Sequence, residues 1–307
     1  MLTHNYSYKS SIADAVKANW KIEDIIGGDK KLDFSKPFLP ETLARVRGLT
    51  SLSEREQTIL NQIRGYSYLY IFGFLEHIIV PFALDHARAV ALTEDLDQTL
   101  ALTMFSAEEA KHIRLFERFC DEFVQGFGSP CGVVPGYIDA AKHVLSHSPL
   151  AVTLFMLVFE WMTQQHYIDS VKDDQDLDKQ FKELLRAHWV EEAQHTKWDV
   201  LMIEKMVSEN GPEFIAKGFE GFASIGMFAV QLLEQTMALD LQSFETAIGR
   251  KLGAEERQQI EAVQRPAYRY TFLVSGLLHK NFLRFVDELN PGTSDHIKGM
   301  AQQLMGG

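Results

Sequence analysis

The sequence predicts an all-α fold in which a four-helix bundle carries additional C-terminal helices and an N-terminal arm. Gly and Pro are few in the middle of the 307-residue chain, apolar residues recur at helical spacing, and strand patterns are nearly absent. Hydrophobic residues at 46% and charged residues at 23% are ordinary values for a globular protein. Because no low-complexity linker interrupts the chain, we expect one domain over residues 1–307.

The N-terminal arm is expected over residues 1–50, with a short helix at Asp14–Ile26 followed by an extended stretch. Either Ser51 or Ser53 ends the arm as an N-cap. A serine side chain accepts a hydrogen bond from a free N–H group of the first helical turn, which stabilises the start of the next helix.

Eight helices are expected after the arm, five in a bundle over residues 51–210 and three packing helices over residues 211–307. Caps, breakers and apolar periodicity place them at about Glu54–Val90, Thr93–Gly126, Ile138–Ser146, Pro149–Val171, from the polar turn at 172–178 to Asn210, Pro212–Ile248, Ala254–Leu289 and a short final helix capped by Ser294. Pro81 and Pro266 lie inside two of these helices, where a proline lacks the N–H of the helical ladder. We expect a bend or break at Pro81 and a kink at Pro266.

The charge and the cysteine content exclude several classes of protein. A net charge of −12 and a pI near 5.4 argue against general affinity for nucleic acid or for anionic membranes. Cys120 and Cys131 offer neither a disulfide framework nor a zinc pattern. The most apolar stretch, Ser67–Leu84, contains a glutamate and a histidine, which favours a buried bundle helix over a membrane span. No signal peptide is recognisable at the start of the sequence, so we expect a cytoplasmic protein.

Two copies of a Glu-Glu-Ala-x-His motif lie on expected helices, one ending at His112 and the other at His195. A single Glu-x-x-His has little weight, because about one match is expected by chance in a chain of this length. Here each copy follows a long apolar helix that carries a glutamate, Glu76 before the first copy and Glu160 before the second. Because residues three apart share a helical face, each motif presents a carboxylate and an imidazole together.

The spacing also places these groups at one height of two helical hairpins. With a turn near Leu92, Glu76 and Glu109 each lie about 24 Å from the turn at a rise of about 1.5 Å per residue. The same reasoning holds for Glu160 and Glu192 about the second turn. Four carboxylates and two imidazoles then face inward at one level, which is how four-helix bundles hold a di-metal carboxylate centre.

The ligand chemistry favours two redox-active cations. Carboxylates balance their charge and imidazoles complete their coordination, so we expect a di-iron centre, with manganese as the alternative metal. Taken singly, a buried glutamate more often pairs with Arg or Lys, and a lone histidine more often stays in the core. Several unpaired buried carboxylates are costly without a cation, and their coincidence favours metal binding. The core-or-surface interpretation is kept for the histidines outside the motifs, which include His77, His86, His166 and His279.

Three further acidic residues near the motifs each have two open interpretations. Glu108 and Glu191 point about 100° away from their neighbours on the helix, either as hydrogen-bond partners of the ligands or into solvent. Asp199, one turn past the second motif, either accepts a hydrogen bond from a ligand imidazole or pairs with Lys197 or Arg186.

His188 distinguishes the second motif from the first. It lies four residues before Glu192 and seven before His195, so the three side chains share one helical face. The first motif has Phe105 in the matching place. A third imidazole on one side makes the predicted centre asymmetric and richer in nitrogen.

The ligand order Glu, Glu-x-x-His, Glu, Glu-x-x-His is similar to that of ferritin-like di-iron proteins. The extended pattern at His188, Glu192 and His195 resembles the p-aminobenzoate N-oxygenase family of ferritin-like di-iron oxygenases, over roughly Ser51–Asp199. The resemblance implies two iron ions, O₂, a small-molecule substrate such as an aryl amine, and an electron donor or reductase. It implies no catalytic residue beyond the metal ligands, which would be Glu76, Glu109, His112, Glu160, His188, Glu192 and His195.

By the same resemblance Glu109 and Glu192 bridge the two metals. The remaining ligands divide between the metals, with Glu76 and His112 on one and with Glu160, His188 and His195 on the other. A homodimer is also expected from the family and from the size of this all-α chain.

The chain departs from the family before each motif histidine, where family copies often carry Arg and this chain has Lys111 and Gln194. That departure leaves the substrate class open. An acyl-chain desaturase or hydrocarbon oxidase shares the paired motifs but not the third histidine. The sequence also allows a ferritin relative that handles iron or peroxide, a ribonucleotide reductase small subunit and a metal-free helical scaffold. A scaffold of this last kind would bind no iron after reconstitution.

Overall fold

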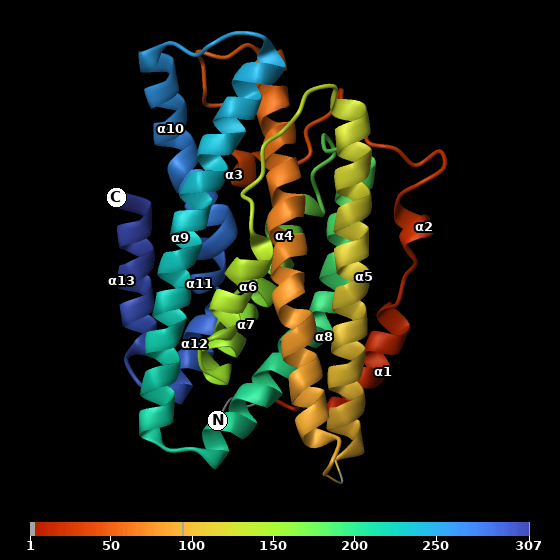
Figure 1. Cartoon of the computed structure of the whole chain (residues 1–307), viewed down its shortest axis with the longest axis vertical. Helices are drawn as coiled ribbons and strands as arrows, with labels where there is room; N and C mark the ends of the chain where they lie inside the picture. Colours follow the sequence, from red (N-terminus) through yellow and green to blue (C-terminus); the bar gives the residue numbers. More distant parts are fainter. Residues whose placement is uncertain (1–3, 94, 307) are drawn as a thin grey trace.

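The computed structural model describes residues 4–93 and 95–306, and Figure 1 shows long helices packed side by side. Within these ranges there is no strand, only an isolated β-bridge between Gly27 and Lys30. Two antiparallel hairpins form the centre of the molecule, and their helices are α4 (Glu54–Val90), α5 (Leu96–Phe127), α7 (Pro149–His166) and α8 (Lys179–Glu209). The predicted all-α fold with a four-helix bundle is therefore confirmed.

The start of α4 is fixed by a capping box. Ser53 accepts a hydrogen bond from the N–H of Glu56, and the Glu56 carboxylate accepts one from the N–H of Ser53. The helix then runs through Pro81 without the break that the sequence suggests. Pro81 lies on the exposed side of α4, where water can hydrate the carbonyl that its missing N–H leaves free.

The predicted start of the next helix at Thr93 is wrong. α5 begins at Leu96, because Asp95 caps it by accepting a hydrogen bond from the N–H of Gln98. Thr93 instead donates its hydroxyl to the carbonyl of Val90 in the turn that ends α4. The intervening Glu94 lies outside the described residues.

The N-terminal arm packs against the bundle and contains more helix than predicted. The single helix at Asp14–Ile26 is replaced by separate short helices, and the arm holds α1 (Tyr8–Ala18), α2 (Ile22–Ile25) and α3 (Glu41–Ala44). Asn19 and Lys21 have ψ values of 138° and 145°, which interrupt the helix around Trp20. α1 lies against α5 and α8, so the arm covers one side of the bundle (Figure 1).

The C-terminal helices depart from the prediction after residue 269. They are α9 (Pro212–Ile248), α10 (Ala254–Arg269), a π-helical segment η2 (Tyr270–Val274), α11 (Ser275–Leu277), α12 (Lys280–Leu289) and α13 (Thr293–Gly306). The predicted helix Ala254–Leu289 breaks at His279, whose side chain caps α12 by accepting from the N–H of Asn281. Ser294 is not a cap: Asp287 accepts hydrogen bonds from the N–H groups of Gly292 and Ser294 at the start of α13.

Two shorter elements complete the chain. α6 (Tyr137–Leu145) matches the short helix predicted at Ile138–Ser146, and a second π-helical segment, η1 (Tyr167–Val171), continues α7. Pro266 lies one turn before η2, so the predicted irregularity coincides with a change in the helical hydrogen-bond pattern.

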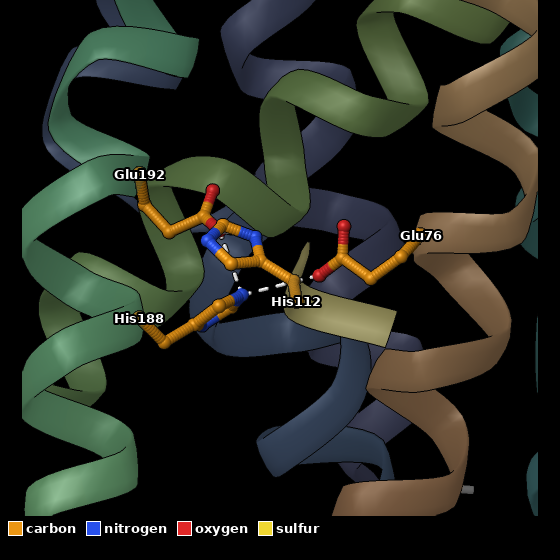
Figure 2. Close-up of side chains that lie close together, drawn as sticks. All are labelled: Glu76, His112, His188 and Glu192. Atoms are coloured by element: carbon orange, nitrogen blue, oxygen red, sulfur yellow. Dashed lines mark hydrogen bonds and ion pairs between the residues drawn. The ribbon is translucent and has the colours of Figure 1, made fainter. Parts of the chain in front are cut away.

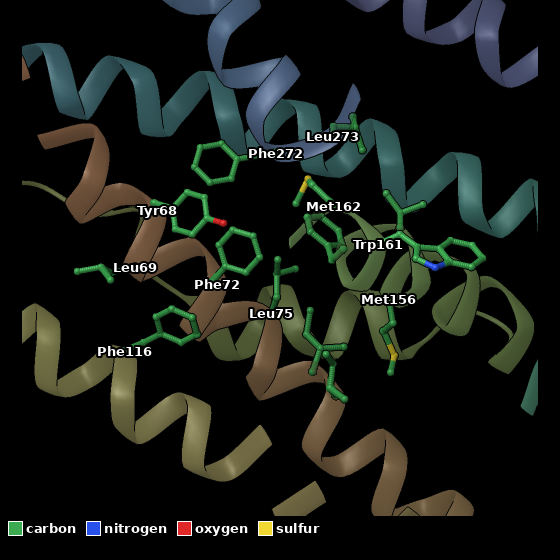
Figure 3. Close-up of a cluster of buried hydrophobic side chains, with 14 of the residues drawn as sticks. Tyr68, Leu69, Phe72, Leu75, Phe116, Met156, Trp161, Met162, Phe272 and Leu273 are labelled. Atoms are coloured by element: carbon green, nitrogen blue, oxygen red, sulfur yellow. The ribbon is translucent and has the colours of Figure 1, made fainter. Parts of the chain in front are cut away.

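The apolar core extends from the arm to α13, and Figure 3 shows the part in which α4, α7 and η2 meet around Phe72. By length and composition alone, α4 and α9 could each cross a membrane. In α4, 56% of the most apolar window is buried inside the molecule, against 28% in α9. The apolar character of α4 is accounted for by its place in the bundle, and that of α9 only in part.

Candidate metal centre

The ligand-type side chains converge in two overlapping groups inside the bundle. Glu76, His112, His188 and Glu192 form the first, and Glu109, His112, Glu192 and His195 form the second. In each group one ligand atom of every residue lies within 4.8 Å of the others, and all the residues are buried. Because the groups share two residues, they describe two neighbouring sites of the size of a metal ion.

The first group meets around His188, as Figure 2 shows. The Nε2 atom of His188 lies 3.1 Å from Glu76 Oε1 and 2.6 Å from Glu192 Oε1. His112 approaches from α5 with its Nδ1 atom 3.2 Å from the same Glu192 oxygen. Three of the four bundle helices therefore contribute to this group.

The second group meets around His195. Its Nδ1 atom lies 2.6 Å from Glu109 Oε1, 3.2 Å from Glu192 Oε2 and 3.9 Å from Glu160 Oε2. Glu160 thus reaches the second group from α7. All seven residues predicted from the sequence are brought together at one level of the bundle.

His188 sits with Glu76, not with Glu160 and His195 as the family resemblance implies. Glu192 lies between the two histidines of α8, one turn after His188 and nearly one turn before His195. The two imidazoles therefore extend to opposite sides of Glu192 along the helix axis.

Glu108 and Glu191, whose roles the sequence leaves open, bind the outer nitrogens of the motif histidines crosswise. Glu191 Oε2 lies 2.9 Å from His112 Nε2, and Glu108 Oε2 lies 2.9 Å from His195 Nε2. Each glutamate therefore fixes the imidazole of the opposite motif with its Nδ1 atom facing the cluster. Lys111 forms an ion pair with Glu191 and so holds this carboxylate in place.

The cluster contains six buried ligand atoms that have no hydrogen-bond partner among the described residues. They are one oxygen each of Glu76, Glu160 and Glu192, both oxygens of Glu109, and Nδ1 of His112. Some of these atoms lie close to a nitrogen atom, but the angles are not those of a hydrogen bond. A buried carboxylate without a partner lowers the stability of the fold. Two cations would satisfy these atoms, so the residues present fit a di-metal centre.

Protons occupy the cluster in the absence of a cation. Burial lowers the pKa of His112, but the nearby carboxylates of Glu109, Glu191 and Glu192 outweigh it and raise that pKa well above its usual value. Burial raises the pKa of Glu160 well above its usual value, and the neighbouring Glu192 carboxylate adds to the rise. Metal ions that bind here must displace these protons.

Asp199 follows neither of the interpretations that the sequence leaves open. It is fully buried, and neither carboxylate oxygen has a hydrogen-bond partner in the described part of the chain. Lys197 pairs with Asp14, and Arg186 pairs with Glu183. Burial raises the pKa of Asp199 well above its usual value, so it is a neutral acid beside the cluster.

Aromatic rings cover the motif histidines. The Phe105 and Trp198 rings lie 4.5 Å and 5.5 Å from the His195 ring. Trp20, from the N-terminal arm, lies nearly parallel to the His112 ring at 5.9 Å. In the first motif, the ring of Phe105 therefore fills the position that matches His188. The contact of Trp20 with His112 could not be predicted, because nothing in the sequence of the arm singles out this residue.

A chamber of about 370 Å³ opens between α4 and α5 beside His188. Phe116 forms part of its wall, and its ring lies 5.1 Å from the His188 ring. Aromatic and polar side chains dominate the lining, among them Tyr66, Tyr70, His77, Glu117, Asp121 and Tyr137. No Lys or Arg lines the chamber in the described part of the chain.

Among solved structures, the fold is similar to that of R2-like ligand-binding oxidases. A mutant R2-like ligand-binding oxidase with an aerobically reconstituted Mn/Fe cofactor matches with a TM-score of 0.55 at 14% identity, over 92% of this chain and 95% of that chain. A second mutant, with an aerobically reconstituted Fe/Fe cofactor, matches with a TM-score of 0.55 at 14% identity, over 92% and 94%. No family model matches the sequence, and no curated protein matches it. At this identity the likeness establishes the fold.

Proposed function

We propose that the protein is a non-haem di-metal oxygenase that activates O₂ and oxidises a small organic substrate. The observation that carries the proposal is the set of six unpartnered ligand atoms buried at one level of the bundle. The Mn/Fe and Fe/Fe cofactors of the structural neighbours support it. When bound, a pair of such ions supplies the redox chemistry that amino-acid side chains lack.

The residues that would hold the two ions are the seven predicted from the sequence. Glu192 belongs to both groups and would be available to either ion, and both oxygens of Glu109 would be free to bind metal. His188 and Glu76 would complete one site, and His195 with Glu160 the other. A donor set of four carboxylates and three imidazoles suits iron and manganese alike.

The protein contributes orientation and exclusion of water. Glu191 and Glu108 hold the motif imidazoles through their outer nitrogens, which fixes the ring tautomer and direction. The aromatic cover around the histidines keeps bulk water from the cluster, so electrostatic interactions inside it are screened less than in solvent.

Oxidation of an aryl amine is the specific reaction that we propose. The chamber beside His188 offers aromatic faces from Tyr66, Tyr70 and Tyr137 and the carboxylates of Glu117 and Asp121. Aromatic side chains can stack on an aryl ring, carboxylates can accept hydrogen bonds from its amino group, and the volume falls in the usual range for small-molecule sites. The two carboxylates in the lining disfavour an acyl chain as substrate, and the lack of Lys or Arg among the described lining residues disfavours substrates that carry a carboxylate.

The first prediction concerns metal content and His188. Purified protein reconstituted with iron, or with iron and manganese, should bind two ions per chain. His188→Ala should lose one of the two under the same conditions, because the Glu76 group then lacks its only α8 nitrogen. Elemental analysis after removal of loose metal measures both quantities.

The matched control is His86→Ala, a half-buried histidine on α4 that contacts the carbonyl of Phe82 and lies outside both groups. It should keep full metal content. Wild-type protein that retains no metal would overturn the proposed function. A screen of aryl amines with the loaded protein and a reductant then tests the specific reaction.

Several parts of the proposed function stay predictions. They are an electron donor or reductase, a homodimer and a cytoplasmic location.

A further inference from the structure

A second, smaller cavity lies next to the amine-sized chamber. It is bounded by α4, α6, α7, α9 and η2 and has a volume of about 50 Å³. Its lining is apolar except for Thr236, and includes Leu75, Phe155, Phe159, Ala229 and Phe272. Phe74 lines both this cavity and the chamber and so separates the two.

The cavity offers no polar group to a ligand. Thr236 donates its hydroxyl to the carbonyl of Leu232 at 2.9 Å, and no charged side chain lines the cavity in the described part of the chain. An apolar cavity of this kind stays dry, because a water molecule inside it would lose its hydrogen bonds. An amine or a carboxylate would be left without a partner for the same reason.

The volume limits the occupant to a very small apolar molecule. An engineered apolar cavity of roughly 150 Å³ has room for a benzene molecule. The cavity here is about a third of that size, so an aryl substrate does not fit while a diatomic gas does.

Phe72 stands between this cavity and the metal centre. Its ring lies 5.9 Å from the His188 ring and 6.4 Å from each of the Phe159 and Phe272 rings, which line the cavity. Figure 3 shows Phe72 among Tyr68, Leu75 and Phe272. One side chain therefore separates the cavity from a predicted ligand.

The outer end of the cavity lies near the surface. Ile71, Phe228 and Ala229 are half-buried, whereas Phe72 on the inner side is 1% exposed. The inner wall also includes Phe272 of the π-helical segment η2, and π segments recur where a helix departs from regular geometry at functional sites.

We propose that this apolar cavity is a dioxygen-binding site through which O₂ reaches the metal centre past Phe72, separately from the substrate chamber. The role of O₂ rests on the proposed function, whereas the binding of an apolar gas does not. Gas and substrate then approach His188 past different aromatic rings, the gas past Phe72 and the substrate past Phe116.

Xenon is the probe for the site, as an apolar gas that X-ray diffraction locates directly. Crystals of the metal-loaded protein under xenon pressure should show xenon between α4, α7 and α9. Ala229→Leu should remove it by filling the cavity, and Ala238→Leu on the exposed side of the same helix should not. The rate constant for oxidation of the reduced protein by O₂ should fall roughly tenfold in Ala229→Leu at unchanged metal content, because protein interiors leave few other gaps.

Two results would overturn the inference. One is a wild-type cavity that takes up ordered water and no xenon. The other is an Ala229→Leu protein that excludes xenon yet reacts with O₂ at the wild-type rate. Protein that binds xenon in the cavity but retains no metal would instead contradict the proposed function, so the two failures are distinguishable.

Discussion

Glu108 and Glu191 are each the first glutamate of a Glu-Glu pair, and each holds the histidine of the other motif in place. Each reaches across the bundle to the imidazole of the other motif. The α5 motif therefore cannot be positioned without the α8 motif. Lys111 adds a positive charge to one of the two pairs, which makes Glu191 the better fixed of the two carboxylates.

Glu191→Gln should weaken metal binding by about 10–100-fold, because loss of an outer partner leaves the ligand imidazole less well oriented and less basic. Burial raises the pKa of Glu191, but His112 and Lys111 lower it by more, so that it lies below its usual value. Glu191 therefore contacts His112 as a charged carboxylate. Competition titration with a chelator measures the affinity. Glu183→Gln is the control, on the same helix in an exposed pair with Arg186, and equal affinities in the two variants would contradict the assignment.

Residues whose roles depend on helical spacing alone could be predicted from the sequence. The seven ligand-type residues follow from i, i+3 and i, i+4 spacing and from equal distances to two turns. Asp199 and Trp20 could not be assigned in this way. Trp20 belongs to the N-terminal arm, and Asp199 lies on α8, against which α1 of the arm packs. The path of the arm depends on such contacts between residues far apart in the sequence.

At the scale of helices, a buried polar cluster joins α4, α9 and α10. Asp240 of α9 accepts hydrogen bonds from Ser67 of α4 at 2.7 Å and from the hydroxyl of Tyr268 of α10. Arg64 lies over the Tyr268 ring at 3.4 Å. Burial raises the pKa of Asp240 to about 7, although Tyr268, Ser67 and Arg64 all lower it.

The raised pKa predicts a pH-dependent stability. Between the ordinary pKa of an aspartate and about 7, folded Asp240 holds a proton that the unfolded chain releases. Its contribution to stability is therefore full at low pH and is lost as the pH rises to about 7, by at most about 1.4 kcal/mol per pH unit.

Asp240→Asn should remove this slope, since an amide does not titrate. Urea unfolding of metal-free wild type and variant at pH 5, 6, 7 and 8 measures the difference between them. Wild type should lose stability relative to the variant up to about pH 7 and no further. A difference that stays constant with pH would refute the protonated aspartate.

A close approach between α11 and α7 makes Gly276 irreplaceable by a larger residue. A Cβ atom there would lie 2.5 Å from the carbonyl oxygen of Val158, a backbone atom that cannot swing aside. Gly276→Ala should therefore destabilise the fold by about 1–3 kcal/mol in urea unfolding. Gly226→Ala in α9 is the matched control, because no atom lies within 4 Å of its Cβ position, and it should stabilise by about 0.5–1 kcal/mol.

Helix positions were predictable where a cap and a long apolar repeat coincide, as at Ser53 for α4. They were not predictable where the side chain that satisfies a helix end does not follow the preferred N-cap pattern. Asp287 provides the acceptor at the start of α13, and His279 starts α12 inside an unbroken apolar repeat. Both contacts are local, but a histidine cap and an aspartate in the preceding helix are not among the usual signals for a helix start.

For the molecule as a whole, metal loading should raise thermal stability. In the metal-free state, the six unpartnered ligand atoms at the centre lower the stability of the fold. An ion that binds only the folded chain raises the free energy of unfolding by about 2.7 kcal/mol when its concentration is a hundred times Kd. The melting temperature should therefore rise by several degrees on loading and return on chelation, as differential scanning calorimetry measures. A protein in which Glu109→Gln leaves this rise unchanged would contradict a role for Glu109 in metal binding.

The placement of the N-terminal arm has a consequence for rates. Trp20 lies on His112, and Trp198, which stacks on His195, donates its Nε1–H to Ser11 of α1 at 2.7 Å. Ions that pass these imidazoles must wait until residues 4–20 move away from the bundle. Metal that leaves past His112 and His195 then stays bound for as long as the arm stays closed. The rate of metal transfer to a chelator should therefore equal the rate of arm opening that amide hydrogen exchange in α1 reports.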